Sequence, residues 1–288
     1  MSADIVYLNG EFLPADQAKV SVLDRGFVFG DGVYEVIPVF GNRLFRLEQH
    51  LDRLERSMAG IRLSNPMSRE AWQSMLEELV ERNADGTDQS VYLQVTRGVA
   101  RRDHGFPDGV TPTVLAMCNP IATMDPEVAA HGVAAITLDD IRWQYCNIKA
   151  ITLLPNILLR QQALDRDAVE AILVRDGLVT EGAASNVFVV RHGVLFTPPT
   201  GPRLLPGITR DLVVELARKN GIDCREEDIP VEALSQAEEI WLTSSTKEIL
   251  PVTRLDDRPV GEGEPGPLWR RLYDIYQEYK RALREAAA

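Results

Sequence analysis

Lysine is scarce in this chain of 288 residues, which has five lysines against twenty-six arginines. A catalytic amine therefore has few candidates. Lys149 differs from the other four because it lies in the mostly apolar segment 146–154, which contains no carboxylate. The other four lie in polar or charged stretches and are expected at the surface, and they are Lys19, Lys219, Lys247 and Lys280.

Apolar surroundings strip water from an amine, disfavour its charged form and lower its pKa. A neutral amine can attack a carbonyl carbon, so Lys149 is a candidate nucleophile. The alternative is a structural lysine whose stem packs on apolar neighbours while its ammonium group reaches water. The segment by itself leaves both interpretations open.

Cysteine and histidine are too sparse to build a metal centre or a disulfide framework. Cys118, Cys146 and Cys224 are widely separated, without a C-x-x-C pair. The four histidines are scattered, without an H-E-x-x-H motif. A phosphate-binding loop of the Walker type and a G-x-S-x-G elbow are also absent from the sequence. We therefore expect no metal site.

Excess positive charge is also lacking, because the formal net charge is -12. This balance argues against a nucleic-acid or anionic-membrane partner, which requires a basic surface. No apolar run is long enough to span a bilayer, and the first residues do not resemble a signal peptide. A hydrophobic content of 45% is ordinary for a soluble globular protein. Because the sequence shows neither a membrane span nor a signal peptide, a cytoplasmic location is expected.

Strand and helix patterns alternate along the chain and predict two lobes of mixed α/β or α+β structure. We predict a smaller N-terminal domain over 1–119, a linker over 120–126 and a larger C-terminal domain over 127–288 that carries Lys149. The predicted strands are 5–8, 11–13, 33–40, 43–45, 91–96, 113–118, 133–136, 171–174, 178–180, 187–190 and 240–243, and the predicted helices are 47–61, 69–83, 155–165, 208–221, a short one from 230, and 267–285.

An aldehyde cofactor bound to Lys149 as a Schiff base would make further demands on the chain. Pyridoxal phosphate is the usual cofactor of this kind, and its ring nitrogen needs a carboxylate that keeps the nitrogen protonated. Glu181 is the candidate, because it ends a predicted strand and is followed by small residues that allow close approach to a ligand. The alternative is a solvated carboxylate in a turn.

A phosphate group needs backbone N–H groups, hydroxyls and a cation. Ile208 and Thr209 begin a predicted helix, where free N–H groups face an anion. Ser244 and Ser245 belong to a run of four hydroxyl residues after a strand, and Arg53 could supply the cation. An ordinary helix start, a polar turn and an exposed arginine are the alternatives.

The segment 96–106 is a short basic loop in an acidic protein. Arg102 and His104 could bind a substrate carboxylate, since a guanidinium offers a two-pronged donor and an imidazole adds another. Tyr34 follows a glycine-rich turn and could add a phenolic hydroxyl. A solvated loop and a half-buried sheet aromatic are the alternatives.

Taken in order along the chain, these segments resemble the motifs of the fold-type IV pyridoxal-phosphate enzymes, and most closely those of bacterial D-amino-acid transaminases. The resemblance covers nearly the whole chain. It rests on Asp24-Arg25-Gly26 with Phe29-Gly30-Asp31-Gly32-Val33-Tyr34-Glu35, Asp140-Ile141-Arg142-Trp143 with Ile148-Lys149, Thr180-Glu181-Gly182 with Ser185-Asn186-Val187-Phe188, Pro206-Gly207-Ile208-Thr209-Arg210, and Thr243-Ser244-Ser245-Thr246.

The resemblance implies a two-domain fold of this type and a ping-pong transfer of the amino group between a D-amino acid such as D-alanine and a 2-oxo acid such as 2-oxoglutarate. It also implies a homodimer, because the loop that carries Arg102 and His104 reaches the neighbouring subunit's site in such enzymes. Ala183-Ala184 departs from the serines that relatives often have. The implied roles are Lys149 for the cofactor and the proton, Glu181 for the ring nitrogen, Leu205 against the ring, Arg53, Ile208, Thr209, Ser244 and Ser245 for the phosphate, and Tyr34, Arg102 and His104 for the substrate carboxylate.

Three other functions fit parts of this pattern. A branched-chain L-amino-acid transaminase would use the same lysine and glutamate but is not expected to carry the pair of Arg102 and His104. An aminodeoxychorismate lyase would use the lysine to eliminate pyruvate. A non-catalytic cofactor-binding protein of the same fold is disfavoured by the joint presence of Lys149 and Glu181.

Overall fold

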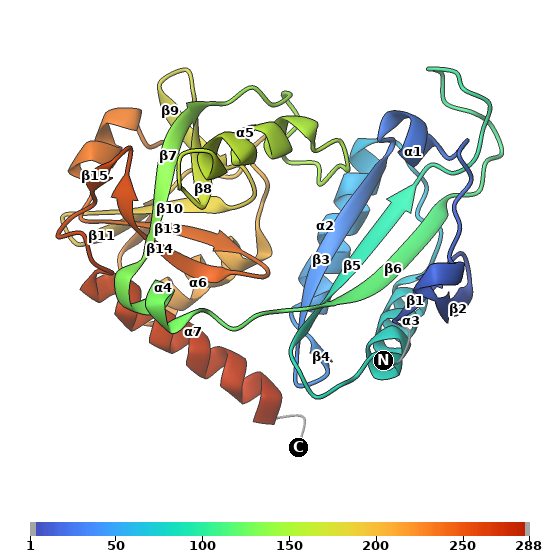
Figure 1. The fold of residues 1–288 in the computed structure, drawn as a ribbon, viewed down its shortest axis with the longest axis horizontal. Helices are drawn as coiled ribbons and strands as arrows, with labels where there is room; N and C mark the ends of the chain where they lie inside the picture. The colour runs from blue at the N-terminus through green and yellow to red at the C-terminus, as the bar shows by residue number, and fades with distance from the viewer. Residues whose placement is uncertain (1–3, 286–288) are drawn as a thin grey trace. The chain divides into compact units, whose positions relative to one another are not determined.

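The computed structural model describes residues 4–285, which form two compact units (Figure 1). The first contains the chain up to residue 122 together with 148–152 and the residues from 283 onward, and the second contains 123–147 and 153–282. The segment with Lys149 thus groups with the first unit. The predicted domain boundaries at 119 and 127 stay a prediction. The predicted domains also include residues 1–3 and 286–288, which lie outside the described residues.

The first unit is built on a six-stranded sheet with the order β2-β1-β6-β5-β3-β4. All neighbouring strands in it run antiparallel. The strands are β1 (Ile5–Leu8), β2 (Glu11–Pro14), β3 (Gly32–Phe40), β4 (Arg43–Leu44), β5 (Gln89–Thr96) and β6 (Thr113–Pro120).

Two long helices cover one face of this sheet (Figure 1). They are α2 (Leu47–Gly60) and α3 (Arg69–Arg82). Leu54 of α2 and Trp72 of α3 are fully buried in the same core as Val33 and Ile37 of β3, so apolar burial holds both helices to the sheet. The short elements of this unit are η1 (Ala15–Gln17) and α1 (Arg25–Phe29).

Two predictions in the first unit that rest on interactions between near neighbours in the sequence are confirmed. Asn9 and Gly10 have positive φ angles of 50° and 101°, as a two-residue hairpin between β1 and β2 requires. Ser68 caps α3, because its hydroxyl accepts a hydrogen bond from the N–H of Ala71 at 3.2 Å.

The second unit contains a nine-stranded mixed sheet in which β12-β11-β10-β13-β14-β7-β8-β9 follow one another and β15 pairs with β14. Val179 of β9 and Val189 of β10 share one core, although these strands stand apart in that order. The sheet therefore curls around this core. Its strands are β7 (Val133–Asp139), β8 (Glu170–Arg175), β9 (Leu178–Gly182), β10 (Asn186–Arg191), β11 (Val194–Thr197), β12 (Cys224–Glu226), β13 (Glu239–Ser244), β14 (Glu248–Leu255) and β15 (Arg258–Pro259).

Helices lie outside this curled sheet (Figure 1). Leu159 and Ala163 of α5 are buried against Ala171 and Leu173 of β8, which forms a second, smaller core. The helices of the unit are α4 (Pro126–His131), α5 (Leu154–Leu164), α6 (Ile208–Lys219), η2 (Val231–Gln236) and α7 (Pro267–Glu285).

Two of the differences between the structure and the sequence prediction have a physical reason. Pro120 still belongs to β6 and Pro126 begins α4, so only 121–125 connects regular elements. The strand β14 was not predicted, because Pro251 lies inside it and proline normally marks an edge or a bulge. Here β14 is central, between β13 and β7, and its pairing with β7 shifts register between Val252 and Arg254.

The expectation that Lys280 lies at the surface is wrong. Lys280 is 6% exposed on α7, and its ammonium group donates to the Glu248 carboxylate at 2.6 Å. Gln277 donates to the other oxygen of the same carboxylate at 2.5 Å. The charges around Lys280 in the sequence concealed the fact that this face of α7 is packed against β14.

We expect the substitution Lys280→Met to lower the free energy of unfolding by about 3 kcal/mol, because it leaves the buried Glu248 carboxylate without its cation. The matched control is Lys219→Met at the exposed end of α6, which should change the free energy by less than about 0.5 kcal/mol. Urea denaturation of both variants measures the difference. Equal effects of the two substitutions would contradict a structural role for the Lys280–Glu248 pair.

Candidate active site

Lys149 lies within the first unit beside β3 and α2. The N–H of Tyr34 donates to its carbonyl oxygen at 2.9 Å, and its own N–H donates to the Ser57 hydroxyl at 3.1 Å. These two bonds fix the backbone of the lysine. Its Nζ atom lies 4.1 Å from the centre of the Tyr34 ring. Within residues 4–285 the amine has no hydrogen-bond or ion-pair partner, so it is free for chemistry.

A buried polar cluster lies next to this lysine in the same unit. The guanidinium of Arg53 donates to both oxygens of Glu35, from Nε at 2.8 Å and from Nη2 at 2.7 Å. His50 places Nδ1 at 2.8 Å from the same carboxylate. His50, Arg53 and Ser57 share one face of α2 because they are three and four positions apart.

The charge states of this cluster follow from burial and pairing. Burial alone would raise the pKa of Glu35, but the charge and hydrogen bonds of Arg53 outweigh it and lower the pKa from the usual 4.5 to about 2. Burial lowers the pKa of His50, so its ring is neutral at pH 7. Nδ1–H then donates to Glu35, and Nε2 is a buried acceptor without a partner among the described residues.

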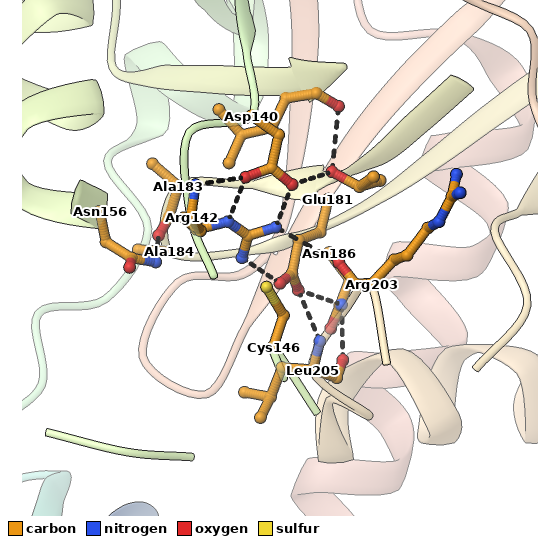
Figure 2. Close-up of polar contacts among 12 residues, drawn as sticks. Asp140, Arg142, Cys146, Asn156, Glu181, Ala183, Ala184, Asn186, Arg203 and Leu205 are labelled. Atoms are coloured by element: carbon orange, nitrogen blue, oxygen red, sulfur yellow. Dashed lines mark hydrogen bonds and ion pairs between the residues drawn. The ribbon is translucent and has the colours of Figure 1, made fainter. Parts of the chain in front are cut away.

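Glu181 is the centre of a second polar cluster, which lies in the second unit (Figure 2). It stands on β9 and is 4% exposed. The Nη1 group of Arg142 donates to its Oε1 atom. The side-chain amide of Asn186 and the backbone N–H of Leu205 donate to Oε2 at 3.1 and 3.0 Å. An ionised carboxylate accepts about four hydrogen bonds, so one position on Oε1 remains for another donor.

Burial governs the titration of Glu181. It raises the pKa of the carboxyl group to about 7, although Arg142 and the Leu205 N–H act in the opposite direction. Burial would raise the pKa of Asp140 as well, but hydrogen bonds from Arg142 prevail and lower it. Glu181 is therefore poised between acid and anion near neutral pH, whereas Asp140 is an anion.

The proposed phosphate residues of the second unit gather around Asn186. The first turn of α6 contains Ile208 and Thr209, and no side chain caps its N–H groups. A Cβ atom added at Gly207 would lie 2.0 Å from Oδ1 of Asn186, so only glycine fits there. Asn186 also pairs in register with Thr243 of β13.

Hydroxyl groups at the end of β13 add to this region. Ser244 and Ser245 are half-buried, and the Ser244 hydroxyl accepts from the N–H of Lys247 at 3.3 Å. The hydroxyl of Thr243 is buried and has no partner among the described residues. Uncapped N–H groups and the unpaired hydroxyl of Thr243 together suit an anion.

The basic loop of the first unit brings Arg102 and His104 together on one aromatic ring. The guanidinium of Arg102 lies 5.2 Å, and the His104 ring 5.4 Å, from the centre of the Phe29 ring. Both side chains are exposed. Tyr34 instead stacks near Tyr92 at 5.7 Å, and no hydrogen bond or ring contact in the described part of the chain joins it to the loop pair.

Sequence reasoning assigned no role to Glu35, His50, Asp140, Arg142 or Asn186. The three- and four-residue spacing of polar residues along α2 was a usable signal for the first cluster. For the second cluster the motifs that contain Asp140, Arg142 and Asn186 gave no pairing, because Arg142 and Glu181 are 39 positions apart in the sequence.

The comparison with protein families identifies the chain. The family model described as amino-transferase class IV matches residues 32–255. The chain belongs to this family, and the predicted fold type is confirmed, as is the prediction of an aminotransferase.

Individual relatives match over nearly the whole chain. It is 43% identical over 272 residues to a D-alanine aminotransferase of Bacillus licheniformis, covering 94% of this chain and 95% of the relative. It is 39% identical to a D-alanine aminotransferase of Staphylococcus aureus strain COL, covering 95% and 97%.

Solved structures give the same fold. The branched-chain amino acid aminotransferase of Escherichia coli superposes with a TM-score of 0.91 at 29% identity, covering 96% of this chain and 94% of the other. A hypothetical aminotransferase from Mycobacterium tuberculosis in a PLP-bound form superposes with a TM-score of 0.83 at 28% identity, covering 94% and 96%.

Residues 4–285 lack two further features. In that range no group of three or more histidine, cysteine, aspartate or glutamate side chains is arranged to hold a metal ion. Nor does any helix there have the length and apolar character needed to cross a bilayer.

We expect Glu35→Gln to lower the free energy of unfolding by about 3 kcal/mol at pH 7, since a shift of one pKa unit corresponds to about 1.4 kcal/mol. The depressed pKa of Glu35 stabilises the fold above the unfolded-state pKa of 4.5, and this contribution is lost as the pH falls toward 2. Urea denaturation of the wild type and of Glu35→Gln should therefore show that their difference in free energy of unfolding becomes smaller as the pH falls from 7 to 3. The control Glu11→Gln, at an exposed residue of β2, should show no such difference in the free energy of unfolding. A difference between Glu35→Gln and the wild type that does not depend on pH would contradict the assignment.

Proposed function

We propose that this chain is a pyridoxal-phosphate-dependent D-amino-acid transaminase. It moves an amino group between a D-amino acid such as D-alanine and a 2-oxo acid such as 2-oxoglutarate. The observation that carries the proposal is the pair of Lys149, a fixed lysine whose amine is unpartnered in the described chain, and Glu181, a buried carboxylate with one acceptor position left.

The side chains fit the chemical groups of the cofactor. The Lys149 amine suits its aldehyde, and the vacant position on Glu181 suits its ring N–H group. The N–H groups of Ile208 and Thr209 and the hydroxyls of Ser244 and Ser245 suit its phosphate, with Arg53 as the cation. Leu205 offers an apolar side chain to the face of the ring. When bound, the cofactor supplies an electron sink for the carbon that loses its proton.

The residues of the chain then hold the reactants and move the proton. With the cofactor bound, the Lys149 amine would take the α-proton of the substrate and would return it to complete the transfer. A positioned base of this kind contributes about 10²–10⁴-fold to the rate. Tyr34, Arg102 and His104 bind the substrate carboxylate. Arg102 and His104 share the Phe29 ring, which supports a joint role.

Preference for the D-form is supported by the relatives named D-alanine aminotransferase, which are 38–43% identical to this chain. The solved branched-chain aminotransferases are 27–29% identical. This difference favours the D-specific reaction over the branched-chain alternative. The basic pair Arg102 and His104 favours it as well, since a branched-chain enzyme is not expected to carry it.

A homodimer is part of the proposal. The first unit exposes a group of large apolar side chains, among them Phe27 at 77% exposure. Leu23 and Val99 of this group lie on adjacent segments, because the N–H of Ala100 donates to the carbonyl of Leu23. Exposed apolar surface of this kind marks a contact with another protein surface. A cytoplasmic location also remains a proposal.

We expect Lys149→Ala to abolish both transamination and the yellow absorbance of the lysine-bound cofactor, because no other amine takes its place. The matched control is Lys219→Ala, which removes an exposed lysine from the end of α6 and should leave both properties unchanged. An absorbance scan and a coupled assay with D-alanine measure them. Turnover in the Lys149 variant that equals the control would contradict the assignment.

A further inference from the structure

Arg142 is the only residue of the described chain whose positive charge contacts Glu181. Its Nη1 group donates to Oε1 of Glu181, and its Nε and Nη2 groups donate to the two oxygens of Asp140, each at 2.9 Å (Figure 2). The side chains of Arg142 and Asp140 are 5% and 0% exposed, so water screens these contacts weakly.

The cluster forms a line of alternating charges. Arg175 contacts Asp140 at 3.0 Å and donates to the carbonyl oxygen of Arg142 at 2.9 Å. Two carboxylates and two guanidinium groups therefore balance in the order Glu181, Arg142, Asp140 and Arg175. Asp140 has a second cation, Arg175, so the negative charge of Asp140 does not depend on Arg142 alone. The negative charge of Glu181 depends on Arg142, its one cationic contact in the described chain.

The other hydrogen-bond donors to Glu181 are uncharged. Asn186 and the N–H of Leu205 are neutral donors, and they stabilise a carboxylate less than a charged donor does. Burial raises the pKa of the nearby Cys146 thiol, which is thus uncharged at neutral pH. A buried carboxyl group with only neutral donors retains its proton.

We propose that Arg142 is a positioning residue that keeps Glu181 in its anionic form before a ligand binds, so that Glu181 can accept the ring N–H of a pyridine ligand without first losing a proton. The inference rests on the proposed function, because it takes Glu181 as the partner of the ring nitrogen. It adds a role for Arg142 that is distinct from contact with the ligand.

The proton balance makes the inference measurable. The final complex contains one N–H group of the ring and one carboxylate, whichever protonation state the free ring has. If Glu181 starts as a carboxylate, it adds no proton to this balance. If it starts as a carboxylic acid, the same complex must shed one proton more. At pH 8, above the pKa of about 7 that Glu181 has beside Arg142, the two cases differ by about one proton per ligand.

Calorimetry of the cofactor-free full chain with pyridoxine 5′-phosphate measures this proton count. The probe carries an alcohol in place of the aldehyde and cannot bond to Lys149. Titrations at pH 8 in two buffers of different ionisation enthalpy give the protons exchanged on binding. We expect Arg142→Gln to take up about one proton fewer per ligand than the wild type. An unchanged count would overturn the inference.

Two matched variants separate the charge of Arg142 from its bulk and from general surface charge. Arg142→Lys retains a cation beside Glu181 and should keep the wild-type count. Arg203→Gln should keep it too, since the side chain of Arg203 is 46% exposed and pairs with Asp176 rather than with Glu181. Loss of about one proton in either variant would contradict the role given to the Arg142 charge.

A variant that retains Arg142 keeps the inference testable if Arg142→Gln does not fold. In Glu181→Gln no carboxylate is present, so its titration from pH 6 to pH 9 should lose the change in proton count that the wild type shows around pH 7. A change that the wild type shows only above pH 8, and that Glu181→Gln lacks, would mean that Glu181 keeps its proton beside Arg142 and would overturn the inference. Failure of the wild type to bind pyridoxine 5′-phosphate at all would instead overturn the proposed function and the inference with it.

Discussion

Buried carboxylates paired with arginine are the interaction on which the candidate site depends. Glu35 with Arg53 in the first unit and Glu181 with Arg142 in the second are both nearly inaccessible to water. Their balance differs, because Glu35 receives two bonds from its arginine and has a low pKa, whereas Arg142 is shared with Asp140 and leaves Glu181 near 7. Breaking either pair would strand a buried charge, which costs several kcal/mol. The carboxylate of Glu35 therefore stays ionised at neutral pH, whereas that of Glu181 can gain or lose a proton there.

The two units contribute different chemistry to the proposed reaction. The first holds the Lys149 backbone between β3 and α2, and it carries the exposed loop with Arg102 and His104. The second holds Glu181 on a strand and presents uncapped N–H groups at α6. Sites built on strands and helix ends are rigid, and rigid donors need no reorganisation when charge develops. The abundance of arginine over lysine fits this plan, since arginine forms the two-pronged bonds that fix a carboxylate.

The sequence predicted those parts of the structure that local chemistry decides. Asn9-Gly10 indicated the first hairpin and Ser68 the start of α3, because each acts on residues one to three positions away. Motif order predicted the family, which the comparisons confirm. Pro251 concealed β14, and the charges around Lys280 concealed its burial, because only the packed sheet decides these environments. Arg142 could not be assigned, since its partner comes from a strand 39 positions away. The roles of the individual site residues stay predictions.

We propose that this chain transfers the amino group of D-amino acids by means of an aldehyde cofactor bound to Lys149. The most direct test mixes the purified yellow protein with D-alanine, and separately with L-leucine, without a 2-oxo acid, and follows the absorbance. D-alanine alone is expected to convert the bound aldehyde form of the cofactor to its amine form. Conversion by L-leucine alone would contradict the D-specific claim and the role given to Arg102 and His104, while leaving Lys149 and the fold in place.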